Sequence, residues 1–119
     1  MAEASYWFDR TAQAIRDIVD EHGGAIIMTR AELCDAILEE DPHLAECPAG
    51  VMRTISRRIT CCLRRRNMAS RGYVSDKKIL LVFDAGMTPD AARAHAEADG
   101  LSDAVQIELF KRQLLEVSA

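Results

Sequence analysis

The chain has 119 residues, of which 49% are hydrophobic, and a formal net charge of −4 at pH 7. A chain of this length closes one hydrophobic core and has no room for two ordinary domains. It has no apolar run of about eighteen residues and no basic and apolar leader between Met1 and Trp7, so we expect a soluble, cytoplasmic protein that does not enter membranes.

Positive charge is concentrated in one part of the chain. Nine of the fifteen Lys and Arg residues lie between Arg53 and Lys78, where Asp76 is the only acidic residue. This block carries about +8, and the remainder of the chain carries about −12. A basic face on an acidic body is typical of proteins that bind polyanions. The charge distribution therefore favours nucleic acid as a partner.

The first predicted elements are a helix and a short strand. From Tyr6 to His22 apolar residues recur at helical spacing, and Gly23-Gly24 ends this segment. The buried side of this helix is expected to contain Trp7, Ala14, Ile15, Ile18 and Val19. The run Ala25–Met28 is short, apolar and rich in β-branched residues, which predicts a strand.

Two further helices are expected after this strand. Thr29 and Glu32 have the spacing of a capping box, which predicts a second helix that ends before Pro42. Its expected buried residues are Leu33, Cys34, Ile37 and Leu38. Pro48 suits the first position of a third helix, which we expect to reach about Asn67.

The third predicted helix has an apolar side and a basic side. At ~100° per residue, one third of its circumference is apolar and is expected to pack inward. That side consists of Val51, Met52, Ile55, Ile59, Cys62 and Leu63. The other arc consists of Arg53, Ser56, Arg57, Thr60, Arg64 and Arg65. A solvated helix usually mixes Glu with Arg, whereas no acidic residue occurs between Ala49 and Gly72.

The rest of the chain is expected to form a hairpin and two helices. The runs Arg71–Val74 and Ile79–Phe83 flank a charged turn, Ser75–Lys78, which predicts a β-hairpin. Thr88-Pro89 begins an alanine-rich helix that Gly100 ends.

The last helix begins at Ser102-Asp103 and carries an apolar stripe. Its members step by three, four and three residues: Ile107, Phe110, Leu114 and Val117. Val105 and Leu109 lie on another side of the same helix, so one apolar face is left over. We therefore expect the stripe to form a homodimer interface, and packing back onto the first helix is the alternative.

No pattern in the chain predicts catalysis, a cofactor or a metal site. A nucleophile with a base, an apolar carboxylate pair and a glycine-rich phosphate loop are all absent from the sequence. The four cysteines lack the spacing of zinc ligands, and we expect reduced thiols that pack as small hydrophobic residues. His22 is expected at the core or its boundary. We expect a protein that is not an enzyme.

The order helix, strand, helix, helix, hairpin, with a basic third helix and lysines at the hairpin tip, resembles the winged helix-turn-helix superfamily over residues 6–84. The resemblance implies an α+β, mostly helical fold, with a winged-helix domain at 1–84 and a C-terminal helical extension at 85–119. In that superfamily the third helix enters the major groove, and the wing touches the flanking backbone. It implies that Arg53, Ser56, Arg57, Thr60 and Arg64 face the groove and that Lys77 and Lys78 lie at the wing tip.

The sequence therefore predicts a protein that binds double-stranded DNA and regulates transcription by occupancy, without a cofactor. Arg65 and Arg71 belong to the same basic block and are expected to add phosphate contacts. The alternative is an interaction module, such as a phage or accessory protein, whose basic face docks onto an acidic protein or RNA.

Overall fold

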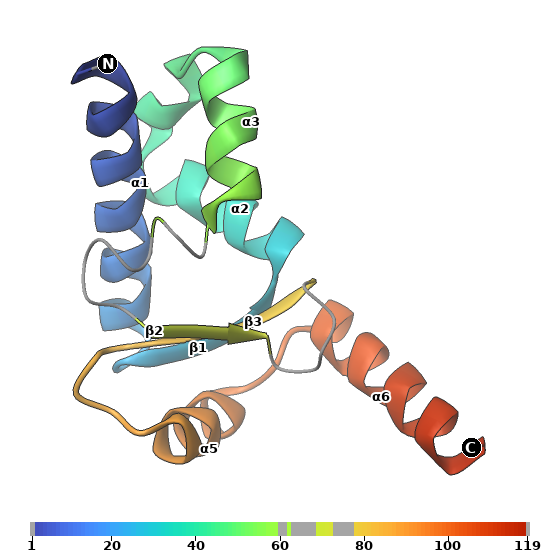
Figure 1. The fold of residues 1–119 in the computed structure, drawn as a ribbon. Helices are drawn as coiled ribbons and strands as arrows, with labels where there is room; N and C mark the ends of the chain where they lie inside the picture. Colours follow the sequence, from blue (N-terminus) through green and yellow to red (C-terminus); the bar gives the residue numbers. More distant parts are fainter. Residues whose placement is uncertain (1, 60–61, 63–68, 73–77, 119) are drawn as a thin grey trace.

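The structure, a computed structural model, describes residues 2–59, 62, 69–72 and 78–118. It is mostly helical with a small antiparallel sheet, so the α+β prediction is confirmed at that level (Figure 1). The elements, in chain order, are α1 (Ala2–Glu21), β1 (Ala25–Thr29), α2 (Arg30–Glu40), the 3-10 helix η1 (Pro42–Glu46), α3 (Ala49–Arg57), β2 (Ala69–Gly72), β3 (Ile79–Phe83), α5 (Pro89–Asp99) and α6 (Asp103–Ser118). No described helix combines the length and the hydropathy needed to cross a membrane.

The described strands form one antiparallel sheet in the order β1-β3-β2. Phe83 of β3 lies between Ala25 of β1 and Ala69 of β2. The predicted pairing of the hairpin strands is confirmed, although the first of them spans Ala69–Gly72 and so begins two residues before the expected Arg71. Residues 73–77, which include most of the predicted turn, lie outside the described residues.

The sheet separates two hydrophobic cores, and β3 contributes to both. Leu80 and Val82 join side chains of α1, α2 and α3 on one face. Ile79, Leu81 and Phe83 join Ala92 and Ala96 of α5 and Val105 of α6 on the other. Because successive side chains of a strand point to opposite faces, all five residues of β3 are buried. Figure 1 shows α1 to α3 on one side of the sheet and α5 on the other.

The helix starts follow from local capping. The predicted capping box is confirmed: the Glu32 amide donates to Thr29 Oγ1 at 3.1 Å, and the Thr29 amide donates to Glu32 Oε1 at 2.9 Å. Thr88 Oγ1 accepts from the Ala91 amide at 3.2 Å at the start of α5. Side-chain oxygens at these positions satisfy amides that have no partner within their helix.

The third helix differs from its prediction. It was expected to reach Asn67, but α3 ends at Arg57, and the Arg58 amide donates to both Thr54 and Ile55. A helical hydrogen bond recurs from the Cys62 amide to the Arg58 carbonyl at 2.9 Å. Residues 60–61 and 63–68, including the predicted inward Leu63, lie outside the described residues.

The buried side of α2 is narrower than predicted. Leu33 and Ile37 are buried, but Leu38 is 38% exposed and Cys34 is only partly buried. At ~100° per residue Leu38 lies about a quarter turn from Ile37, so it reaches the edge of the contact with α3. Cys34, Cys47 and Cys62 are free thiols, while Cys61 lies outside the described residues.

Hydrogen bonds from α5 hold it against the end of α1. His95 Nε2 donates to the His22 carbonyl at 2.7 Å, and His22 Nδ1 lies 2.7 Å from Asp99 Oδ2. His22 is half-exposed, which confirms a boundary position. Gly23 follows with φ +82°, and a Cβ there would lie 2.7 Å from His95 Nε2. This turn therefore requires glycine for both its backbone and its space.

We predict that Gly23→Ala destabilises the fold by about 1–2 kcal/mol or more, because a left-handed backbone strains any residue with a Cβ. Gly50→Ala is the matched control, since Gly50 lies inside α3 with nothing within 4 Å of its Cβ position. The control is expected to gain up to about 1 kcal/mol from helix propensity. Urea unfolding measures both changes, and equal effects would contradict the assignment.

Candidate nucleic-acid interface

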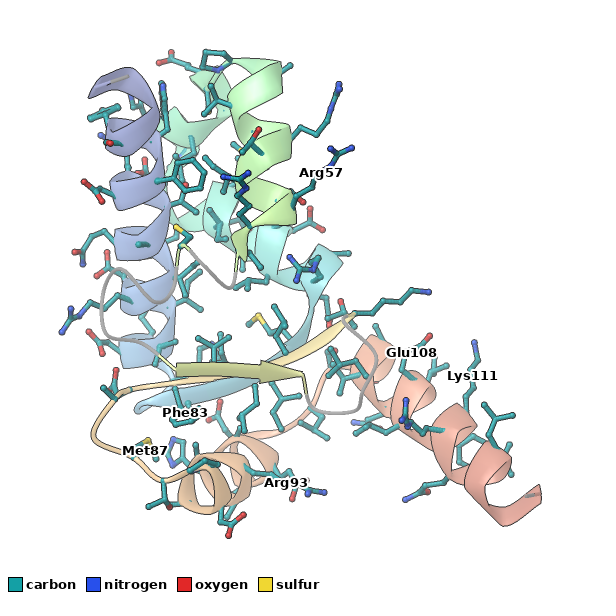
Figure 2. The ribbon with its side chains drawn as sticks, viewed as in Figure 1. Arg57, Phe83, Met87, Arg93, Glu108 and Lys111 are labelled. Carbon is teal, nitrogen blue, oxygen red and sulfur yellow. The ribbon has the colours of Figure 1, made fainter. Side chains whose placement is uncertain are left out.

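The described part of α3 presents arginines on the side away from the core. Ile55 is buried, and Val51 and Met52 pack against the same core. Arg53 and Arg57, four residues apart, are exposed on the opposite arc, as the pattern predicted. Arg58, which caps α3, is also exposed. Figure 2 shows Arg57 extending from α3 away from the rest of the chain.

Acidic residues in the described part of the chain do not neutralise these arginines. Among the described residues, Arg53, Arg57 and Arg58 form no ion pair. Asp41 instead pairs with Arg10, and Glu46 pairs with His43. The arginine face therefore keeps its charge available for an external anion.

Arg30 connects α2 to the end of α3. As the first residue of α2 it places a cation at the positive end of a helix dipole, which is unfavourable by itself. Its Nη1 donates to the Ser56 carbonyl at 2.7 Å, one residue before the end of α3. The last carbonyls of a helix lack partners and carry partial negative charge, so the guanidinium caps α3.

The backbone of Arg30 also reaches the base of the hairpin. Its amide donates to the Lys78 carbonyl at 2.5 Å, and Lys78 is exposed immediately before β3. The start of α2, the end of α3 and the start of β3 therefore meet at one residue. We call the described cations at this junction the basic surface: Arg30, Arg53, Arg57, Arg58 and Lys78. Sequence periodicity missed Arg30, because the contact with Ser56 spans 26 residues.

The remaining predicted contact residues are placed only in part. Ser56 is half-buried at the edge of α3 facing α2, where its Oγ lies 3.9 Å from Cys34 Sγ. Arg71 belongs to β2, opposite Leu81, but its side chain lies outside those described. Thr60, Arg64, Arg65 and Lys77 lie outside the described residues.

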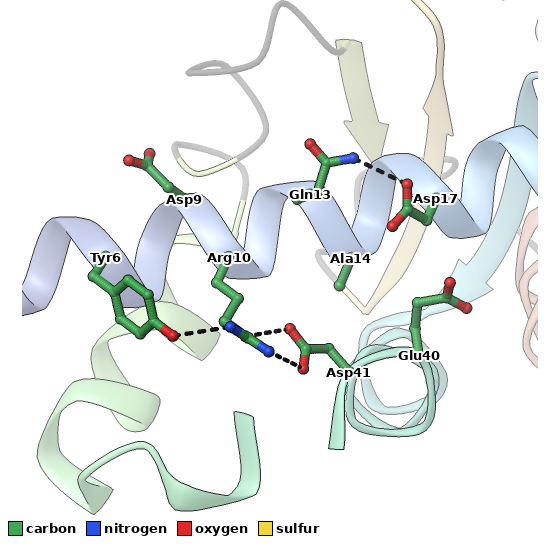
Figure 3. A pocket seen from close by; sticks show the side chains of 8 residues that line it. All are labelled: Tyr6, Asp9, Arg10, Gln13, Ala14, Asp17, Glu40 and Asp41. Carbon is green, nitrogen blue, oxygen red and sulfur yellow. Dashed lines mark hydrogen bonds and ion pairs between the residues drawn. The ribbon is translucent and has the colours of Figure 1, made fainter. Parts of the chain in front are cut away.

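Acidic side chains gather elsewhere, in a hollow of about 410 Å³ between α1 and the end of α2 (Figure 3). Arg10 spans this hollow: its Nε and Nη2 contact the two Asp41 oxygens at 2.5 and 3.0 Å, and its Nη1 donates to Tyr6 Oη at 2.8 Å. Asp9, Asp17 and Glu40 line the same hollow. The hollow therefore has one cation, already paired, among four carboxylates.

The carboxylates of the hollow titrate differently from one another. The hydrogen bond from Arg10 holds the pKa of Asp41 below its ordinary value of 3.8. Desolvation, followed by a hydrogen bond shared with Glu21, raises the pKa of Glu40 above its ordinary value. Paired and crowded carboxylates shift in these opposite directions, so the hollow is suited to cations and not to phosphates.

The predicted dimer interface lies on the solvent side of α6. Ile107, Phe110 and Leu114 are exposed, whereas Val105 is buried and Leu109 packs against the second core. The alternative, packing of the stripe onto α1, is not what the structure has. Val117 belongs to α6, but its side chain lies outside those described.

Comparison with protein-family models, with curated proteins and with solved structures gave no match to this chain.

We predict that Arg30→Ala lowers the free energy of unfolding by about 1–3 kcal/mol, because it removes a charge-assisted hydrogen bond that caps α3. Arg93→Ala is the control, since Arg93 forms an exposed pair with Glu97 on α5 that is worth about 0.3–0.5 kcal/mol. Urea unfolding of both variants tests this. A loss for Arg30→Ala no larger than for the control would show that α3 does not depend on the cap.

We also predict that the pair of Arg10 and Asp41 loses its effect in acid. A depressed pKa gives stability that is present above the ordinary value of 3.8 and is lost as the pH falls through the lower, folded value. Asp41→Asn should therefore be less stable than the wild type at pH 7, and the two should converge below about pH 3. Urea midpoints over this range measure the gap, with the exposed Asp9→Asn as control. A gap independent of pH would contradict the assignment.

Proposed function

We propose that this protein binds double-stranded DNA through the basic surface and regulates transcription by occupancy. The observation that carries the proposal is the arginine side of α3, exposed and without ion pairs among the described residues. Arg30 and Lys78 add two cations beside the end of that helix. A local patch of this kind acts on phosphates within about 8 Å in physiological salt, so the net charge of −4 does not prevent binding.

The arrangement of the elements supports a winged-helix mode of binding. A helix, a strand, two helices and a hairpin follow one another from α1 to β3, and the hairpin strands share a sheet with β1. In this mode α3 enters the major groove, and the hairpin reaches the adjacent backbone. Arg30 then has a positioning role, because it holds the end of α3 and the base of the hairpin at a fixed separation.

The chemistry of the cations matches this division of roles. Arginine donates through a planar fork that fits a phosphate or the O6 and N7 atoms of guanine, so Arg53 and Arg57 are the proposed contacts from the helix. Lysine acts as a point charge and carries little sequence information, so Lys78 is a proposed phosphate contact.

The alternative is an interaction module whose basic surface docks onto an acidic protein or RNA. Gel-shift titrations of a random-sequence duplex and of single-stranded RNA over a salt series distinguish the two. For duplex binding the logarithm of the affinity should fall with the logarithm of salt concentration, with a slope of about −0.9 per phosphate contacted. Preference for RNA, or no binding to either nucleic acid at low salt, would overturn the proposal.

We predict that Arg53→Ala combined with Arg57→Ala weakens duplex binding and reduces the salt slope by about two, because two phosphate or base contacts are lost. The melting midpoint should stay nearly unchanged, since both side chains are exposed. Arg16→Ala combined with Arg93→Ala removes the same charge from exposed positions on α1 and α5 and serves as control. Equal loss of binding in the two double variants would contradict a local contact through α3.

A further inference from the structure

Helix α6 has two apolar faces on opposite sides, and only one of them is covered. Val105 and Leu109 pack against the sheet and α5. At ~100° per residue, Ile107, Phe110 and Leu114 lie about half a turn away from that face. They are 54%, 61% and 52% exposed, and the nearby Leu115 is 72% exposed. In Figure 1 the C-terminal part of α6 extends away from the other elements.

A groove of about 540 Å³ lies beside the first half of this exposed stripe. Ala104 and Ile107 of α6 form one wall, and Ala31, Arg30 and Lys78 form the other. Leu115 lies on the same side of α6 as Ala104, three turns further along the helix. One continuous surface therefore contains an apolar groove at its beginning and protruding leucines at its end.

We propose that this surface binds a second copy of the chain, with the two α6 helices antiparallel about a two-fold axis near Phe110. A two-fold interface must be complementary to itself, because each contact occurs twice. An axis near Phe110 places Phe110 against the partner's Phe110 and Ile107 against the partner's Leu114. The partner's Leu115 then enters the groove between Ala31 and Ala104. This proposal does not depend on DNA binding.

Charge complementarity favours the antiparallel arrangement over a parallel one. The C-terminal end of a helix carries a partial negative charge of about half an electron. In the antiparallel pair, this end of the partner helix approaches Arg30 and Lys78 at the rim of the groove. In a parallel pair the two negative ends lie together, and the groove stays empty. Lys111 lies near the proposed axis, but Glu108 of the same chain is 4.0 Å from it and offsets its charge.

The test exchanges charges across the proposed interface. Ile107→Lys alone and Leu114→Glu alone each place a charge against an apolar partner twice, so each variant should be monomeric by light scattering at tens of micromolar. Both substitutions in one chain should restore the dimer, because antiparallel pairing sets each new lysine against the partner's new glutamate. Parallel pairing would set like charges together and leave the double variant monomeric.

The control carries the same exchange on α5, as Ala91→Lys combined with Ala98→Glu. Both positions are exposed and also seven residues apart, so this variant should keep the mass of the wild type. A monomeric wild type, or a double variant that stays monomeric, would overturn the proposal. So would loss of the helical circular dichroism signal in either single variant, because the stripe would then belong to the chain's own core.

Discussion

The position of every other element depends on the burial of β3. Ile79–Phe83 is paired along both edges, to β1 and β2, and covered on both faces. A fully buried apolar strand needs a layer of side chains on each side, and α1 to α3 supply one layer while α5 and α6 supply the other. Removing either layer would expose the same strand. The first residues of α5 and α6 are therefore part of the arrangement that holds the basic surface in place.

Charge is separated on this scaffold by the elements that carry it. The cation of the acidic hollow, Arg10, is held by Asp41 and Tyr6, so it is not part of the basic surface. The described part of α3 carries arginines and no acid. Local fields, and not net charge, decide where an anion binds at physiological salt. If the proposed α6 pairing forms, each dimer carries two basic surfaces, and binding through both raises the effective affinity.

Features that depend on neighbouring residues were predictable from the sequence. The capping box at Thr29, the cap at Thr88 and the stop at Gly100 all lie within a few residues of the atoms they satisfy. The five residues predicted on the inner side of the first helix, Trp7, Ala14, Ile15, Ile18 and Val19, are all buried. Helical period and capping chemistry are local, and no distant contact overrides them here.

Features that depend on distant contacts were not predictable in the same way. No glycine or proline occurs between Val51 and Arg71, so nothing local indicated that α3 ends at Arg57. The cap by Arg30 joins residues far apart in the chain. Both faces of α6 are apolar, so the period alone left open which of them packs, and the contacts of Val105 with the sheet decided it.

Trp7 gives the two layers different spectroscopic visibility. It is the only tryptophan in the chain, and it is buried in the core that α1, α2 and α3 form on one face of the sheet. Its ring stacks on His43 of η1 with centroids 5.2 Å apart, and its Nε1 has no hydrogen-bond partner among the described residues. Intrinsic fluorescence therefore reports on this layer, whereas α5 and α6 contribute to circular dichroism without a tryptophan of their own. Unfolding curves from the two signals coincide only if β3 makes both layers melt as one cooperative unit.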